Sequence, residues 1–405
     1  MIDIYPQFKP SDEVVKVIGS YDCVHSHKYG SNEVSKQSTI SPFYLYHDIF
    51  YKHLKGDIIV IGLAYPDFML HKSMRIKFQG QFYEPYERLY PADHMMYIYK
   101  FHIGVHNDIH THIETHCQPD DIDDTTYIVQ HRLTRRLINK RYNYWIFTMF
   151  KYDINLLSIW ASYYKKLGFD GYTLYFNGPK PDKTNQPYEI QQIYNRYLIN
   201  IMAWDFDYWL LYDKCKLVTD PIITHPQYKS LPNSMQPDPN GLSLIHGAQA
   251  LAMNQWVYKY GDLYDFVFFC DLDEILFLGG GNNTINSFVT SHNFSCYIFR
   301  MTWANLPDVK KIEFWNNWTT LKSNVMMTEN KFLPVPIRTK YMVRPENIKC
   351  LSIHMPVFYP CQGQVCRFDV ETARFYHFFN WSGKSRTCEC TFKDASLQNL
   401  TATFR

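Results

Sequence analysis

Three carboxylates, Asp271, Asp273 and Glu274, follow an apolar segment at residues 266–270. A strand that is apolar on both faces is typical of the centre of a sheet covered on both sides. In an extended chain Asp271 and Asp273 point to the same side. Two carboxylates at such a short distance repel each other unless a cation lies between them. Mg²⁺ or Mn²⁺ with a diphosphate meets that need, because such an ion takes one or two carboxylates and completes its shell with phosphate oxygens and water. The motif predicts a site for a metal ion and a nucleotide-sugar; the alternative is that both aspartates only cap the loop after the strand.

A second candidate lies in the aromatic segment 374–385, which contains His377, Gly383 and Lys384. An imidazole on a short strand can complete the shell of a metal ion, and a nitrogen ligand favours Mn²⁺ over Mg²⁺. Gly383 would let the backbone approach a diphosphate whose charge Lys384 neutralises. His354 is the alternative metal ligand. The simpler interpretation of His377 is a hydrogen-bonded histidine among aromatic rings.

Four further charged residues are candidates for binding and catalysis. Lys340 and Arg344 could contact phosphate or an acceptor, and ordinary surface charge is the alternative. A carboxylate that deprotonates an acceptor hydroxyl is also needed for glycosyl transfer. Glu313 and Asp308 are the candidates for this base, because both follow the strand predicted over residues 296–302. Surface charge is again the alternative.

Five histidines lie between His102 and His116. On a strand, His110 and His112 would share one face and could chelate a metal ion. We favour the simpler interpretation, a polar and half-exposed strand.

The segments around the carboxylates alternate between strand and helix from residue 141 onwards. Strands that alternate with helices indicate a parallel sheet, and ligands bind such sheets beyond the carboxyl ends of the strands. Asp153 is a possible cap for the first helix, and Gly168 follows its end. The predicted strands are 144–150, 172–176, 208–212 and 265–270, and the predicted helices are 153–167, 188–204 and 246–260.

The rest of the chain is predicted to be mainly β-structure. Strand patterns cover 57–62, 74–83 and 95–105 before the alternating region, and 296–302, 341–354 and 373–379 after it. The change of pattern near residue 140 predicts a β-rich N-terminal domain at 1–135 and a catalytic domain at 136–405.

Composition excludes some classes of protein. The chain has 405 residues with 41 Lys and Arg against 39 Asp and Glu, and this net charge of +2 argues against a strongly basic nucleic-acid binder. No apolar run reaches the ~18 residues that a membrane-spanning helix needs. The first residues lack the apolar stretch of a signal peptide, so we expect a soluble, cytoplasmic protein without a transmembrane segment.

The candidate segments, taken in order, resemble glycosyltransferase family 92 and its family-2-like relatives over roughly residues 141–380. The resemblance includes the helix with Trp160, Tyr163 and Tyr164 and the Tyr175-Phe176-Asn177 turn. It continues through three segments, which are residues 271–276, residues 340–354 with Lys340, Arg344 and His354, and residues 373–378.

This resemblance implies a GT-A fold, a nucleotide-sugar donor, Mn²⁺ and inversion at the anomeric carbon. UDP-galactose is the best-known donor of the family. By the resemblance, Asp271 and Asp273 match the metal-binding motif, and His377 matches the late histidine that often joins it.

The sequence therefore predicts a metal-dependent, inverting hexosyltransferase that moves a sugar from a UDP-sugar to a glycan or glycoprotein. The expected fold is α/β, with a Rossmann-like, mostly parallel catalytic sheet. One alternative is a carbohydrate-binding or inactive glycosyltransferase-like protein. Another is a metal-dependent phosphohydrolase.

Overall fold

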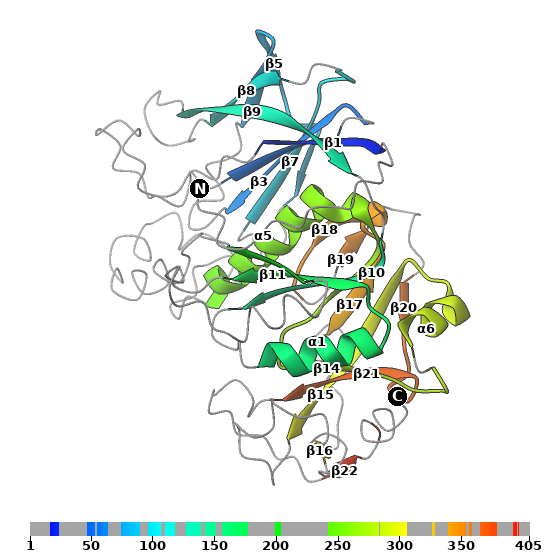
Figure 1. Ribbon diagram of the computed structural model, residues 1–405. Helices are drawn as coiled ribbons and strands as arrows, with labels where there is room; N and C mark the ends of the chain where they lie inside the picture. The colour runs from blue at the N-terminus through cyan, green and yellow to red at the C-terminus, as the bar shows by residue number, and fades with distance from the viewer. Residues whose placement is uncertain are drawn as a thin grey trace, which may run out of the picture.

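In the part of the chain that it describes, the computed structural model (Figure 1) contains a 9-stranded and an 11-stranded sheet, and helices pack on both faces of the second sheet. The structure describes residues 17–23, 47–52, 55–63, 74–89, 96–106, 110–117, 127–138, 142–150, 156–176, 199–203, 242–282, 284–305, 326–328, 339–353, 356–358, 365–378, 392–394 and 396.

Nine antiparallel strands form the N-terminal sheet, in the order β5-β4-β8-β9-β1-β2-β3-β7-β6. The sequence patterns at 57–62, 74–83 and 95–105 are confirmed as strands β3, β4 with β5, and β7. The bounds are β1 (Val17–Cys23), β2 (His47–Lys52), β3 (Asp57–Leu63), β4 (Arg75–Phe78), β5 (Gln81–Tyr83), β6 (Glu87–Leu89), β7 (Met96–His102), β8 (His110–Cys117) and β9 (Tyr127–Ile138).

The second sheet begins with four parallel strands in the order β12-β11-β10-β13, and antiparallel β17 and β15 follow β13. The α/β class is confirmed, but the sheet is mixed rather than mostly parallel. Its strands are β10 (Tyr142–Phe150), β11 (Gly171–Phe176), β12 (Ile199–Ala203), β13 (Tyr264–Phe269), β14 (Glu274–Leu278), β15 (Cys296–Asn305), β16 (Met326–Thr328), β17 (Lys340–Val343), β20 (Val365–Arg367), β21 (Ala373–Phe378) and β22 (Phe392–Asp394).

The remaining described elements are helices and one small ribbon. They are α1 (Leu157–Lys166), α5 (Leu242–Tyr260), η5 (Gly261–Leu263), α6 (Ile285–His292), η6 (Pro345–Asn347) and the paired strands β18 (Ile348–Leu351) and β19 (Pro356–Phe358). Among the residues that the structure describes, no helix is both long and apolar enough to cross a bilayer.

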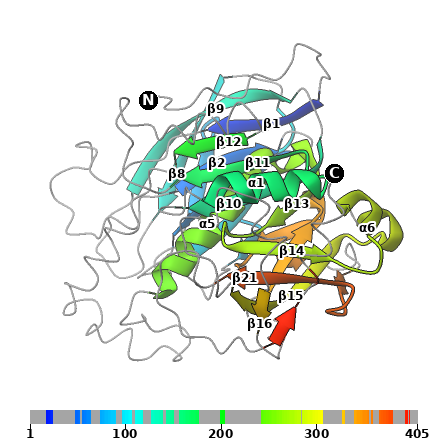
Figure 2. The ribbon, with the colours of Figure 1, turned by 60° about the horizontal axis from the view of Figure 1, so that its bottom comes forward.

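Strand β13 is covered on both faces, as its apolar sequence predicts. Phe266 and Phe268 share a core with α1, whereas Val267 and Phe269 share a core with α5. Figure 1 shows the same layers from top to bottom, with the N-terminal sheet above α5, then the parallel strands, then α1. Figure 2 shows α1 lying in front of the parallel strands.

Helix α1 ends at the predicted glycine, but its start differs from the prediction. Gly168 has a φ of +96°, in the left-handed region that glycine favours after a helix. The residue before the first turn is Leu156, which makes no side-chain capping bond, and Asp153 lies outside the described residues.

The predicted helix at 188–204 is wrong over its last residues. Residues 199–203 form strand β12, which pairs in parallel with β11. A short apolar run fits a buried strand and a helix segment equally well, and here pairing with the neighbouring strand decides the outcome. Residues 188–198 and the strand predicted at 208–212 lie outside the described part of the chain.

The N-terminal sheet and the second sheet share a hydrophobic core across α5. Ile61 and Ile98 of the first sheet belong to the same buried cluster as Trp256 of α5 and Val267 of β13. Two ion pairs add to this contact, from Lys52 on β2 to Asp262 (2.9 Å) and from Glu87 on β6 to Lys349 on β18. Along the chain, β9 is the last strand of the first sheet, and β10, which follows it, belongs to the second sheet. The division into domains 1–135 and 136–405 stays a prediction.

The shared core predicts that the two sheets unfold together. Ile98 is fully buried, so Ile98→Ala is expected to lower the free energy of unfolding by about 3 kcal/mol. Urea denaturation followed by circular dichroism should show one transition, shifted as a whole. Val105→Ala is the matched control, because Val105 is 58% exposed and should change stability by less than about 0.5 kcal/mol. Two resolved transitions, of which Ile98→Ala moves only one, would contradict the shared core.

Candidate active site

The carboxylate motif lies in a tight turn between β13 and β14. The Glu274 amide donates a hydrogen bond to the Asp271 carbonyl (3.2 Å). The chain therefore turns here, whereas the sequence analysis predicts an extended segment. Leu272 is buried, the Asp271 side chain is 42% exposed, and the Asp273 side chain is 12% exposed. The turn therefore gives the two aspartates different surroundings.

Helix α1 holds this turn through hydrogen bonds. The Trp160 indole donates to the Asp271 carbonyl (3.1 Å), and the Tyr164 hydroxyl donates to the Glu274 carbonyl (3.0 Å). The same Tyr164 hydroxyl accepts a hydrogen bond from the Leu276 amide (3.0 Å). Trp160 and Tyr164 are fully buried, so these bonds satisfy polar atoms that would otherwise be costly to bury. Buried side chains of α1 therefore hold the turn in place.

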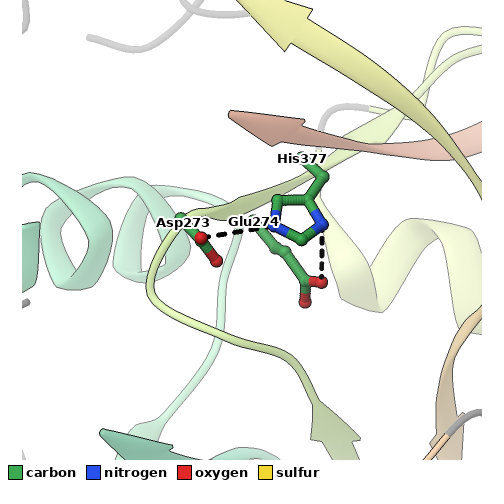
Figure 3. Close-up of side chains that lie close together, drawn as sticks. All are labelled: Asp273, Glu274 and His377. Atoms are coloured by element: carbon green, nitrogen blue, oxygen red, sulfur yellow. Dashed lines mark hydrogen bonds and ion pairs between the residues drawn. The ribbon is translucent and has the colours of Figure 1, made fainter. Parts of the chain in front are cut away.

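His377 lies beside the turn because β21 pairs with β14. The antiparallel register puts His377 opposite Glu274, and the Phe378 amide donates to the Asp273 carbonyl (2.9 Å). His377 Nε2 is 3.2 Å from Asp273 Oδ2, and His377 Nδ1 is 3.5 Å from Glu274 Oε1 (Figure 3). The half-buried Trp303 indole packs on the imidazole at 4.5 Å between ring centroids.

Lys340 enters the same cluster from β17. Its Nζ is 2.8 Å from Asp271 Oδ2 and 3.1 Å from Glu274 Oε2. Burial alone would lower the pKa of Lys340, but the carboxylates of Asp271 and Glu274 outweigh this effect and raise it. Burial raises the pKa of Glu274, and Lys340 opposes that rise. The ammonium therefore stays charged.

Three side chains in this cluster fit a divalent metal ion. One ligand atom each from Asp273, Glu274 and His377 lies within 4.8 Å of the others. Two carboxylate oxygens and one imidazole nitrogen suit Mn²⁺, which accepts both kinds of ligand. Of the predicted metal ligands, Asp273 and His377 are brought together. Asp271 faces Lys340 instead.

Residues 217–403 match the family model of glycosyltransferase family 92. Residues 217–403 are a family 92 glycosyltransferase domain. The chain is an enzyme that moves a sugar from a donor to an acceptor, and the matched residues include the whole cluster from the turn at Asp271 to His377. The resemblance seen in the sequence is thereby confirmed. A search of curated proteins found no match.

The other predicted site residues of the family 92 domain are separate from the cluster or undescribed. Arg344 lies four residues beyond Lys340, roughly 13 Å along the strand direction, with its guanidinium 4.2 Å from the centre of the Phe266 ring. The residues outside the described ranges are His354, Gly383, Lys384, Glu313 and Asp308. Their roles stay predictions.

The histidine tract forms part of the N-terminal sheet, away from the family 92 match. The strand predicted at its end is confirmed as β8. His102 Nδ1 is 2.9 Å from Asp57 Oδ1, and His116 Nε2 is 3.1 Å from Glu114 Oε2. The side chains of His110 and His112 lie outside the described part of the structure, so the choice between a polar strand and a chelating pair stays a prediction.

Glu274 is a further candidate metal ligand that the sequence does not single out. It is next to Asp273, and on an extended strand adjacent residues point to opposite faces. The turn brings Glu274 and Asp273 to the same imidazole. A carboxylate on the first residue after a turn is the signal that could have suggested it.

Proposed function

We propose that the chain is a metal-dependent, inverting hexosyltransferase with a GT-A catalytic domain. It takes a UDP-sugar as donor, with UDP-galactose as the first candidate, and a glycan hydroxyl as acceptor. The observation that carries this proposal is the Asp273, Glu274 and His377 cluster within a family 92 domain.

The position of the cluster supports a nucleotide-sugar site. It follows the carboxyl end of β13, which pairs in parallel with β10. Ligands of open α/β sheets bind beyond the carboxyl ends of the parallel strands. The four parallel strands, with helix α1 packed on one face, support the proposal of a GT-A nucleotide-binding half.

The ligand set supports metal dependence. Asp273, Glu274 and His377 would hold the ion, as Mn²⁺ or Mg²⁺. When bound, such an ion offsets the negative charge that develops on the departing nucleoside diphosphate. Trp303 packs on one side of His377 and orients its imidazole.

Other residues have roles that follow from the resemblance and their chemistry. Gly383 and Lys384 are proposed to contact the diphosphate, and Arg344 is a further candidate. Asp308 or Glu313 is proposed as the base that deprotonates the acceptor hydroxyl, the step that inversion requires of a side chain.

Chelation of the metal is the first test. EDTA should abolish sugar release from the preferred donor in a panel of nucleotide-sugars, and added Mn²⁺ should restore it, because the carboxylates and imidazole need the ion to bind the diphosphate. The measurement is free sugar and free UDP by chromatography. Full turnover in EDTA would contradict metal dependence. Release of inorganic phosphate without sugar would instead indicate a phosphohydrolase.

A further inference from the structure

Lys340 is a buried cation that joins two carboxylates of the candidate active site. Its side chain is 7% exposed, and the Glu274 side chain is 2% exposed. The ammonium is 2.8 Å from Asp271 Oδ2 and 3.1 Å from Glu274 Oε2. A buried charge is costly unless it is paired and hydrogen-bonded, so Lys340 and its partners depend on each other.

Glu274 links this ion pair to the metal ligands. One of its carboxylate oxygens, Oε2, faces Lys340, and the other, Oε1, lies 3.5 Å from His377 Nδ1. Oε2 also accepts a hydrogen bond from the Asp271 amide (2.8 Å). Glu274 is therefore held in one orientation, with one oxygen on each side of the cluster.

The charges in the cluster match one divalent ion. With all three carboxylates ionised and His377 neutral, three negative charges and one ammonium leave the cluster with two negative charges. A single divalent cation neutralises these two charges. Without the ammonium, the three carboxylates would attract additional positive charge.

We propose that Lys340 is a positioning residue that takes the place of a second cation. It draws the Asp271 carboxylate away from the metal, so that Asp273, His377 and the Glu274 oxygen that faces His377 bind one divalent ion. The inference rests on the proposed function, because it assumes an ion at this cluster. It departs from the sequence prediction, in which Asp271 and Asp273 share the metal.

The test is Mn²⁺ binding to the full chain without donor, measured from the electron paramagnetic resonance signal of free Mn²⁺. Asp271→Asn should bind Mn²⁺ within about threefold of the parent, whereas Asp273→Asn should bind at least about tenfold more weakly. These two substitutions are matched, since they make the same change two residues apart in one turn. A tenfold or greater loss in Asp271→Asn would overturn the inference.

Lys340 itself is tested with a double-mutant cycle. Lys340→Met should release Asp271 and raise Mn²⁺ affinity about tenfold, because it removes a positive charge beside the metal ligands, and adding Asp271→Asn should remove that gain. Lys340→Arg keeps the charge and should behave like the parent. Equal Mn²⁺ binding in the parent, Lys340→Met and the double variant would overturn the inference.

The outcomes separate this inference from the proposed function. If the parent binds no Mn²⁺ even with UDP, the metal-dependent function fails and the inference fails with it. If the parent binds Mn²⁺ through Asp273 but Asp271→Asn also loses it, only the role of Lys340 fails. If Lys340→Met does not fold, the comparison of the two asparagine variants still decides the question.

Discussion

Asp273→Asn is expected to reduce Mn²⁺-dependent sugar transfer by at least about a hundredfold, since metal ligation supplies several kcal/mol of transition-state stabilisation. The substitution removes one carboxylate of the Asp273, Glu274 and His377 cluster and leaves an amide, which is a weaker ligand. The fold should persist, because the Asp273 carbonyl still accepts the hydrogen bond from the Phe378 amide. The measurement is kcat/KM for the preferred donor at saturating Mn²⁺.

The control for this variant is Asp265→Asn. Asp265 lies near the start of β13, and Asp273 follows the end of the same strand, so the control makes the same chemical change far from the cluster. It should retain parental kcat/KM within about twofold, because Asp265 lies at the opposite end of β13 from the cluster. Comparable losses in both variants would mean that Asp273 acts through stability rather than through the metal.

Arg374→Met is expected to lower the free energy of unfolding by about 3 to 5 kcal/mol, the usual effect of breaking a buried ion pair. The Arg374 side chain is 5% exposed and donates to the Tyr376 hydroxyl (2.7 Å), the Val370 carbonyl (2.7 Å) and the Ser396 hydroxyl (2.7 Å). It also pairs with Asp394 (3.4 Å), and the Tyr376 hydroxyl donates to the same carboxylate (2.7 Å).

This network ties β22 to β21, the strand that carries His377. Urea denaturation of the parent and variant gives the stability difference. Lys393→Met on β22 is the matched control, because Lys393 is exposed and should change stability by less than about 0.5 kcal/mol. A similar small change in Arg374→Met would show that the network contributes nothing to stability.

The same network predicts a dependence on pH. Burial alone would raise the pKa of Asp394, but hydrogen bonds from Ser396 and Tyr376 and the charge of Arg374 outweigh burial and lower it. A carboxyl whose pKa is lower in the folded state stabilises the fold above its unfolded value of about 3.9. That contribution is lost as the pH falls below the unfolded-state pKa and then through the lower pKa of the folded state. The stability difference between the parent and Asp394→Asn should therefore shrink between neutral pH and pH ~3.

Local patterns predicted the parts of the fold whose signals lie within one segment. The apolar run 266–270 falls mainly on strand β13, whose residues are buried apart from the half-buried Asp265, and Gly168 follows the end of α1. In these cases side-chain type and spacing carry the structural information. The Asp273 and His377 pairing joins segments 104 residues apart, and it was predicted from metal-ligand chemistry and the resemblance to family 92 rather than from a local pattern.

Contacts between distant segments that the family resemblance does not mark were not predicted. The strand β12 exists because it pairs with β11, and its own apolar run also fits a helix. Lys340 reaches Asp271 only because β17 pairs antiparallel with β13, a relation that the sequence of neither strand reveals. The extended-chain assumption at Asp271 failed because Trp160 and Tyr164 of α1 hold the chain in a turn.

The most direct test of the proposed site is an anomalous-scattering experiment on crystals of the full chain grown with Mn²⁺ and UDP. Data at the manganese edge should show one peak between the Asp273 carboxylate and the His377 imidazole, with the Asp271 carboxylate still on Lys340. No peak at this cluster, or a peak at another set of residues, would contradict the account.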